Sequence, residues 1–83
     1  MLHDGDIGVT GGHQFFAVKE HVNGNLHECY WSVFIDDSVI DLEQSRYYVH
    51  YKANDKELRI LKSFLFDEGY VLKGNKIIES NEF

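Results

Sequence analysis

His13–Asp36, with the sequence HQFFAVKEHVNGNLHECYWSVFID, is the stretch that decides the fold. Two runs rich in apolar and aromatic residues flank Asn23-Gly24 in its middle. A type I′ turn needs positive φ at both central residues, and Asn-Gly adopts that conformation readily. The stretch therefore predicts a β-hairpin of two long strands, and the other segments are placed around it.

The length of the hairpin loop sets which residues face each other. A two-residue loop places Glu20 opposite His27 and Lys19 opposite Glu28, whereas a three-residue loop places Glu20 opposite Glu28. Like charges directly opposite each other destabilise a sheet, so we expect the two-residue loop. The same register forms two apolar pairs, Val18 with Cys29 and Phe16 with Trp31.

Side chains alternate between the two faces of a strand, so this register also assigns the faces of the hairpin. The face expected in the core carries Phe16, Val18, Cys29, Trp31, Val33 and Ile35. The other face carries Phe15, Ala17, Lys19, Tyr30, Ser32 and Phe34. Because Phe15, Tyr30 and Phe34 would then be exposed, they predict an aromatic patch of the kind found at interfaces.

The later segments predict further elements of an α+β domain. Aromatic and β-branched residues alternate over Arg46–Lys52, which is typical of an amphipathic strand that joins the sheet of the hairpin. Asn54 and Glu57 form a capping box that opens a helix, and Gly69 ends it. Tyr70–Ile78 carries a Lys-Gly-Asn-Lys turn and predicts a second, shorter hairpin. The expected architecture is a mostly antiparallel sheet of the first hairpin plus one or two further strands, with one helix packed on one face.

We expect a single domain over residues 13–79. Residues 1–12 are rich in glycine and predict a flexible segment, with a short extended piece at Ile7–Val9. Residues 80–83 are expected to fray. Residues 36–38 predict a turn, followed at residues 39–42 by either an extended piece or a helical turn. On the helix, Leu58, Leu61, Phe64 and Leu65 form an apolar stripe, whereas Ile60 and Phe66 lie off it and are either covered by flanking segments or available to a partner.

Composition limits the classes of function. The chain has 83 residues, a formal net charge of −6, one cysteine and no proline. All of the net charge arises in residues 1–51, which contain two basic residues, Lys19 and Arg46, and eight acidic residues. A negative field repels nucleic acid and attracts basic protein surfaces. A single cysteine forms no disulfide framework, and no apolar run has the length of a membrane span, so a cytoplasmic location is expected.

No pattern in the sequence indicates a metal site, a cofactor or a catalytic residue. The sequence contains five histidines but no CxxC or HxxxH motif. The expected register also places His21 and His27 on opposite faces of the hairpin. Cys29 could form a catalytic Cys-His pair with His27 or His50, but its side chain is expected to face the core, where burial keeps a thiol inert. We therefore expect a protein that is not an enzyme.

A nucleic-acid-binding domain is a weaker alternative. The helix at residues 55–68 carries Lys56, Arg59 and Lys62, and the hairpin after it carries two further lysines. The same helix holds several acids, however, and the net charge of the chain opposes binding to phosphates. Direct contact with nucleic acid is therefore not expected.

The remaining hypothesis is binding of a protein partner that presents a basic surface. Aromatic side chains supply buried area at an interface, while acidic side chains steer a basic partner. The predicted site is Phe15, Glu20, Glu28, Tyr30, Phe34, Asp36, Asp37, Asp41 and Glu43. The chain would act as an inhibitor or adaptor, for instance on an enzyme that handles nucleic acid. A homodimer or other homo-oligomer, formed through a strand edge or the aromatic face, is the alternative.

Overall fold

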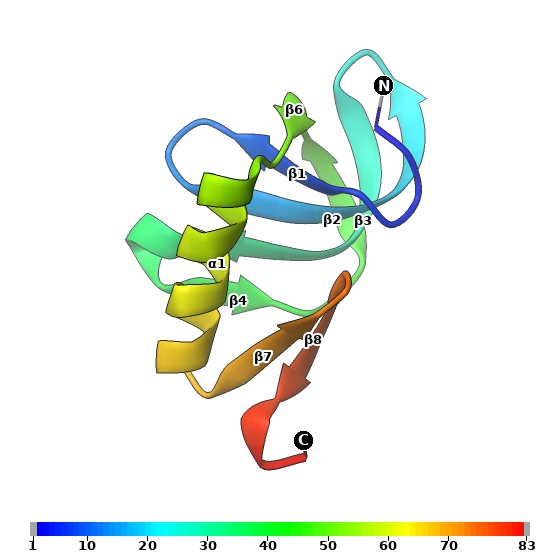
Figure 1. Cartoon of the computed structure of the whole chain (residues 1–83). Helices are drawn as coiled ribbons and strands as arrows, with labels where there is room; N and C mark the ends of the chain where they lie inside the picture. The colour runs from blue at the N-terminus through cyan, green and yellow to red at the C-terminus, as the bar shows by residue number, and fades with distance from the viewer. Residues whose placement is uncertain (1, 83) are drawn as a thin grey trace.

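An antiparallel sheet, a helix and a separate C-terminal hairpin build the protein (Figure 1). The computed structural model describes residues 2–82. The sheet contains β1 (Ile7–Thr10), β2 (Gln14–Asn23), β3 (Leu26–Phe34), β4 (Val39–Asp41), β5 (Ser45–Tyr48) and β6 (Tyr51–Lys52). Helix α1 (Asp55–Asp67) leads to the hairpin of β7 (Tyr70–Lys73) and β8 (Lys76–Glu79), and short 3₁₀ helices cover Ile35–Asp37 and Ser80–Glu82. The predicted α+β class is confirmed.

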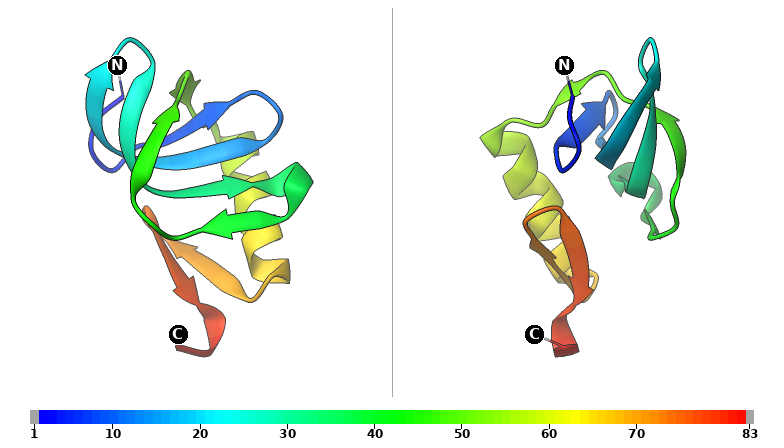
Figure 2. Two further views of the ribbon diagram at one scale, coloured as in Figure 1. Left: turned by 180° about the vertical axis from the view of Figure 1, so that it is seen from behind. Right: turned by 90° about the vertical axis from the view of Figure 1, so that its right-hand side faces the viewer.

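The sheet curls so that one segment bridges its two edges. The strand order is β4-β3-β2-β1-β6, with neighbours antiparallel, and β5 pairs with β3. β5 and β6 are consecutive in the chain, yet they pair with β3 and β1, which lie on opposite sides of β2. Residues 45–52 therefore cross from one side of the sheet to the other (Figure 2). Such near-closure protects strand edges from unwanted pairing.

The predicted strand at Arg46–Lys52 joins the sheet as expected, but it is interrupted. Val49 and His50 separate β5 from β6. The amide of Val49 donates to the carbonyl of Asn25 (2.8 Å), and the amide of His50 donates to that of Val9 (3.1 Å). Val49 is fully buried at this crossing. The interruption lets the chain change its partner strand without leaving these backbone groups unpaired.

The register of the β2–β3 hairpin differs from the predicted one. Val18 faces Cys29 as expected, but Glu20 faces Glu28, the like-charge pair that the sequence argued against. The loop consists of Gly24 and Asn25 instead of Asn23 and Gly24. Gly24 has a φ of 53°, and Asn25 is not among the residues with positive φ. This pattern fits a type II′ turn, which needs glycine at its first central position.

Both faces of the hairpin are buried, which overturns the predicted division into a core face and an exposed face. The register of β2 with β3 shifts between the Phe16–Ser32 pair and the Val18–Cys29 pair. This irregularity places the side chains of Cys29 and Trp31 on opposite faces of the sheet. One cluster, the helix-side core, contains Ile7, Val9, Phe15, Ala17, Trp31, Val33, Ala53, Leu61 and Leu65. The other, the inner core, contains Leu2, Phe16, Val18, Cys29 and Val49.

Helix α1 begins and ends where the sequence predicts. The side chain of Asn54 accepts from the amide of Glu57 (2.8 Å), and the carboxylate of Glu57 accepts from the amide of Asn54 (3.0 Å), which completes the capping box. Gly69 follows the helix with a φ of 89°. Leu61 and Leu65 are fully buried against the sheet. Of the two residues off the stripe, Ile60 is half-buried and Phe66 is 72% exposed.

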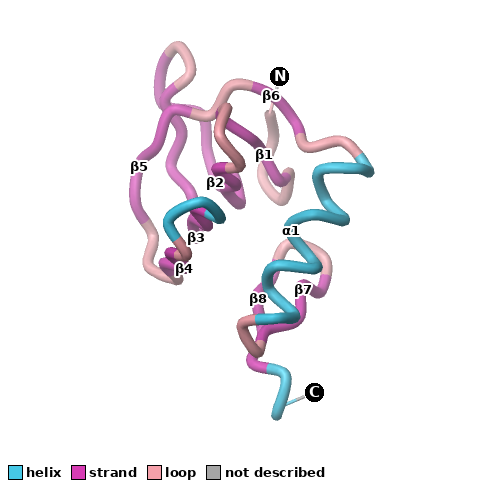
Figure 3. Tube along the Cα trace, turned by 90° about the vertical axis from the view of Figure 1, so that its left-hand side faces the viewer, coloured by secondary structure: helices cyan, strands magenta, loops and turns pink. Residues whose placement is uncertain are grey.

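The C-terminal hairpin is tied to the sheet as well as to the helix. β7 and β8 form a two-stranded sheet of their own beside α1 (Figure 3). Tyr70, Leu72 and Ile77 pack against the helix-side core. The indole Nε1 of Trp31 donates to the backbone carbonyl of Asn75 (2.7 Å), at the tip of the hairpin. The predicted Lys-Gly-Asn-Lys turn is confirmed, with Gly74 at a φ of 63°.

The N-terminal segment is part of the domain, contrary to the prediction that residues 1–12 lie outside it. The extended piece expected at Ile7–Val9 is present as β1, and it pairs with both β2 and β6. Leu2, Ile7 and Val9 are buried. Met1 and Phe83 lie outside the described residues, and fraying of residues 80–83 stays a prediction.

Candidate binding surface

The predicted aromatic patch does not form. Phe15 is fully buried in the helix-side core. Tyr30 packs at the margin of that same core, whereas Phe34 packs on the inner core, edge-on to Phe16 at a centroid distance of 5.9 Å. Because the three rings lie in different environments on two sides of the sheet, they do not form one surface. Phe15 is therefore removed from the candidate site.

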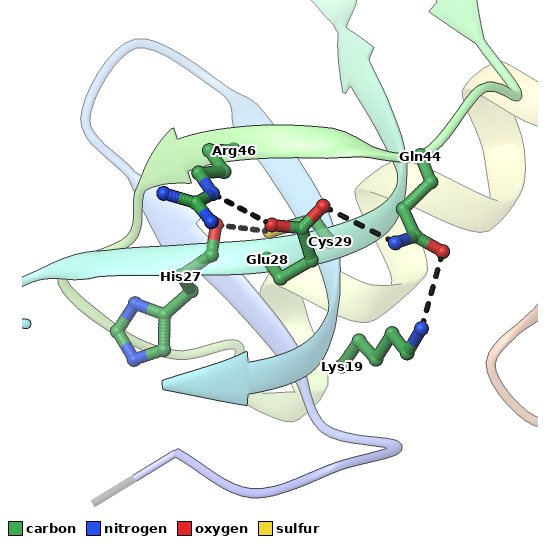
Figure 4. A network of polar contacts seen from close by, with 6 residues as sticks. All are labelled: Lys19, His27, Glu28, Cys29, Gln44 and Arg46. Carbon is green, nitrogen blue, oxygen red and sulfur yellow. Dashed lines mark hydrogen bonds and ion pairs between the residues drawn. The ribbon is translucent and has the colours of Figure 1, made fainter. Parts of the chain in front are cut away.

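Glu28 is engaged within the molecule rather than available to a partner (Figure 4). Its carboxylate accepts from Nε of Arg46 (2.9 Å) and from Nε2 of Gln44 (3.2 Å). Lys19 donates to the Oε1 of Gln44 (3.4 Å). The Gln44 amide and the Arg46 guanidinium hold the pKa of Glu28 below its ordinary value. These contacts also explain why Glu20 tolerates Glu28 opposite to it.

Tyr30 keeps a polar tip near the surface. Its hydroxyl donates to Oδ1 of Asp4 (2.9 Å), and Nζ of Lys19 lies 5.9 Å from its ring centroid. The hydrogen bond to Asp4 raises the pKa of the Tyr30 hydroxyl. The ring is half-buried, so one part of it remains accessible beside the C-terminal hairpin.

Four of the nine predicted site residues are gathered on one open edge of the sheet. We call residues 36–43 the acidic edge; it carries Asp36, Asp37, Asp41 and Glu43. Two apolar side chains lie between them, Val39 (42% exposed) and Leu42 (49% exposed). β4 ends the strand order, so within residues 2–82 its outer side is unpaired.

The carboxylates of the acidic edge have few partners of their own. Nδ1 of His13 lies 3.4 Å from Oδ1 of Asp36, and Oδ1 of Asp41 accepts from the amide of Glu43 (2.9 Å). Among the residues that the structure describes, no Lys or Arg pairs with any acid of this edge. Their charge is therefore directed to solvent. Glu20 is also exposed, but it lies on β2 beside the hairpin turn, apart from this segment.

A cleft that the sequence did not predict adjoins the acidic edge at Leu42. It has a volume of about 720 Å³ and lies between the sheet and the C-terminal hairpin. Its walls are formed by Asp4, Gly5, Tyr30, Trp31, Leu42, Asn75, Lys76, Ile77 and Ile78. A cavity of this size with mostly apolar walls and a few polar groups is typical of a ligand or peptide site. We call it the hairpin cleft.

The histidines on the β2–β3 hairpin share a face, contrary to prediction. The observed register pairs His21 with His27, and their ring centroids are 5.2 Å apart. Each ring nitrogen that faces the turn is bonded to a backbone carbonyl: His21 to Gly24 (2.9 Å) and His27 to Asn25 (2.7 Å). Within residues 2–82, no group of three or more His, Cys, Asp or Glu side chains is placed to hold a metal ion.

Comparison with known proteins does not add a family to this description. No protein-family model, no curated protein and no solved structure matches the chain. None of the helical segments in residues 2–82 has the length and apolar character needed to cross a bilayer.

Proposed function

We propose that the protein is a small, non-enzymatic, cytoplasmic binding module that docks its acidic edge on a basic surface of a protein partner. It would act as an inhibitor or adaptor, for instance by occupying a basic groove of an enzyme that handles nucleic acid. The predicted site is revised to Tyr30, Asp36, Asp37, Asp41 and Glu43, to which Val39 and Leu42 are added. Phe15, Glu28 and Phe34 are left out because they are engaged in the fold, and Glu20 is left out because it lies on β2, apart from the acidic edge.

One observation carries this proposal: exposed Val39 and Leu42 lie on an open edge of the sheet, between acids for which residues 2–82 supply no Lys or Arg partner. Apolar side chains supply contact area that is buried on binding, and the surrounding charges raise the rate of association with a partner of opposite charge. An open edge can also accept backbone hydrogen bonds from a partner. Buried Cys29, the sole cysteine, is compatible with a reducing compartment.

Charge reversal tests the proposal. The tagged wild-type protein is used to capture partners from lysate, which mass spectrometry then identifies. We expect an Asp37→Lys/Glu43→Lys variant to lose the captured partner. Glu20→Lys/Asp67→Lys is the matched control, since it makes the same change in net charge with two exposed acids away from the edge. Raised salt should weaken the wild-type complex. Equal capture by both variants would refute the role of the acidic edge.

A homodimer is the second candidate, and it is favoured by the outer sides of β4 and β8, which no other strand within residues 2–82 covers. Unpaired strand edges are templates for pairing with another copy of the same chain. Light scattering at high micromolar concentration distinguishes the two functions. A dimer whose mass is unaffected by charge reversal at Asp37 and Glu43 would support self-association over the electrostatic docking proposed above.

A further inference from the structure

One edge of β8 is free to pair with another strand. Within the described residues, β8 pairs with β7 alone. The residues that flank a two-residue loop form a hydrogen-bonded pair, and such pairs alternate with non-bonded ones along an antiparallel ladder. Counting from the Lys73–Lys76 pair, the backbone groups of Ile77 and Glu79 point away from β7. The bond from the Ser80 amide to the Gly69 carbonyl (2.9 Å) agrees with this alternation.

This free edge borders the hairpin cleft. Four successive residues, Asn75 to Ile78, line the cleft. Successive side chains of a strand point to opposite faces of the sheet. Because the cleft touches all four of these residues, it runs along the edge of the strand and not over one face. Tyr30, Trp31 and Leu42 form the opposite wall. The cleft therefore offers a free strand edge on one side and apolar side chains on the other.

The charges around the cleft define the chemistry of its occupant. Asp4 lies in its wall, and Asp41 and Glu43 flank Leu42 in the chain. Lys76 is the cation in the wall. The ammonium of Lys19 lies 5.9 Å from the centroid of the Tyr30 ring, which also lines the cleft. Three carboxylates against these two ammonium groups favour a segment that carries Lys or Arg. The apolar side chains of Trp31 and Leu42 favour a segment that also carries apolar residues.

We infer that the hairpin cleft binds an extended segment of the protein partner, with alternating apolar and basic residues, which adds as a strand to the free edge of β8. This inference rests on the proposed function and names the kind of partner segment. In this mode of recognition the backbone hydrogen bonds supply affinity, and the alternating side chains supply specificity. The apolar side chains would point toward Trp31 and Leu42, and the basic side chains would lie near Asp4, Asp41 and Glu43.

The experiment uses the full chain labelled with ¹⁵N and a capped peptide of the sequence Lys-Val-Arg-Val-Lys-Val. We expect saturable NMR shifts of the amides of Ile77 and Glu79 and of the Trp31 indole, with a Kd of about 1 mM or below. The same peptide with alternate amides methylated cannot complete the strand ladder, and we expect it to bind about tenfold more weakly.

Two matched variants locate the site. Leu42→Ala should weaken peptide binding by about tenfold, since Leu42 lines the cleft. Phe66→Ala removes an apolar side chain that is 72% exposed on α1, outside both the cleft and the acidic edge, and should leave the affinity unchanged. Shifts confined to residues 36–43, equal binding of the methylated peptide, or no saturable shift at millimolar peptide would each overturn the inference. Selective loss of the captured partner by the Asp37→Lys/Glu43→Lys variant would still uphold the proposed function in those cases. Peptide binding together with equal partner capture by both charge-reversal variants would refute the proposed function alone.

Discussion

Gly8 is the residue where the packing of the sheet leaves no room for a side chain. A Cβ built at this position would overlap Cγ1 of Val49 and lie 3.4 Å from the carbonyl oxygen of Tyr51. The close approach lets residues 49–52 cross over β1 and close the sheet. The sequence showed Gly8 only as one of several glycines in a segment expected to be flexible, so nothing local distinguished it from Gly11.

Gly8→Ala should therefore destabilise the protein by about 1–3 kcal/mol, the usual cost of overfilling a packed core. Urea unfolding followed by tryptophan fluorescence measures the change. Gly11→Ala is the matched control, because a Cβ there meets nothing within 4 Å. We expect that control to be neutral or slightly stabilising. A Gly8→Ala variant as stable as the wild type would show that β1 and the 49–52 crossing do not pack as described.

Cys29 is a second residue whose environment decides its chemistry. Burial in the inner core, together with the neighbouring charge of Glu28, raises the pKa of the thiol to about 12. The folded protein at pH 8 should therefore react with a maleimide far more slowly than the same chain in urea, where the thiol has its ordinary pKa. Ser63→Cys provides an exposed thiol on the helix in the same molecule as an internal standard. Labelling of Cys29 at the rate of that standard would contradict its burial.

At the scale of elements, the β2–β3 hairpin shows what the sequence can and cannot predict. The sequence Asn23-Gly24-Asn25 contains both Asn-Gly and Gly-Asn, and each dipeptide suits a tight turn. The prediction chose a two-residue loop at Asn23-Gly24 over a three-residue loop in order to avoid Glu20 opposite Glu28, and that argument considered two strands alone. Arg46 of β5, together with Gln44 just before that strand, contacts Glu28, and no local pattern predicts the pairing of β5 with β3. The elements were predictable, whereas the register depended on a third strand.

Arg46→Met should destabilise the hairpin at pH 7, and the deficit should shrink in acid. The pKa of Glu28 is lower in the folded protein than in the unfolded chain, so its contribution to stability is present above the ordinary glutamate pKa of about 4.3 and is lost as the pH falls through the lowered folded value. Without Arg46 the folded pKa rises, so less stability remains to be lost. Urea unfolding at pH 7 and at about pH 3 compares the two proteins.

Lys62→Met is the control for Arg46→Met, since it removes one exposed positive charge on α1 and no ion pair is found for Lys62 among residues 2–82. A deficit for Arg46→Met that is equal at both pH values would indicate that Arg46 acts through its alkyl chain and not through Glu28.

The candidate site also combines residues that are close together in the sequence with residues that only the fold brings together. Asp36, Asp37, Asp41 and Glu43 lie within eight positions of the chain, so the sequence could place them together as an acidic segment. The hairpin cleft joins Trp31 and Leu42 to residues 75–78, which are far away in the sequence. Its formation depends on how the C-terminal hairpin packs after the helix, and the bond from Trp31 to Asn75 fixes that position.

For the whole molecule, the N-terminal segment decides whether the sheet closes. β1 is bonded to β2 on one side and to β6 on the other, so it joins the hairpin to the segment that leads into the helix. The amide of Ala53 donates to the carbonyl of Ile7 (2.8 Å) just before α1 begins. The segment also contributes to both cores, with Ile7 and Val9 in one and Leu2 in the other. A domain of this size has a small free energy of unfolding, so the loss of a few contacts can unfold it.

Deleting residues 1–10 should therefore abolish cooperative folding, not merely shorten a flexible end. The deletion removes three buried apolar side chains, each of which stabilises the folded state by about 1.5–3 kcal/mol, and it leaves one side of β2 unpaired. A chain that lacks residues 1–6 keeps β1 but loses Leu2, so we expect it to fold with reduced stability. Amide NMR dispersion and thermal unfolding compare both with the full chain. A 1–10 deletion that keeps a dispersed spectrum and a sharp transition would restore the view that this segment lies outside the domain.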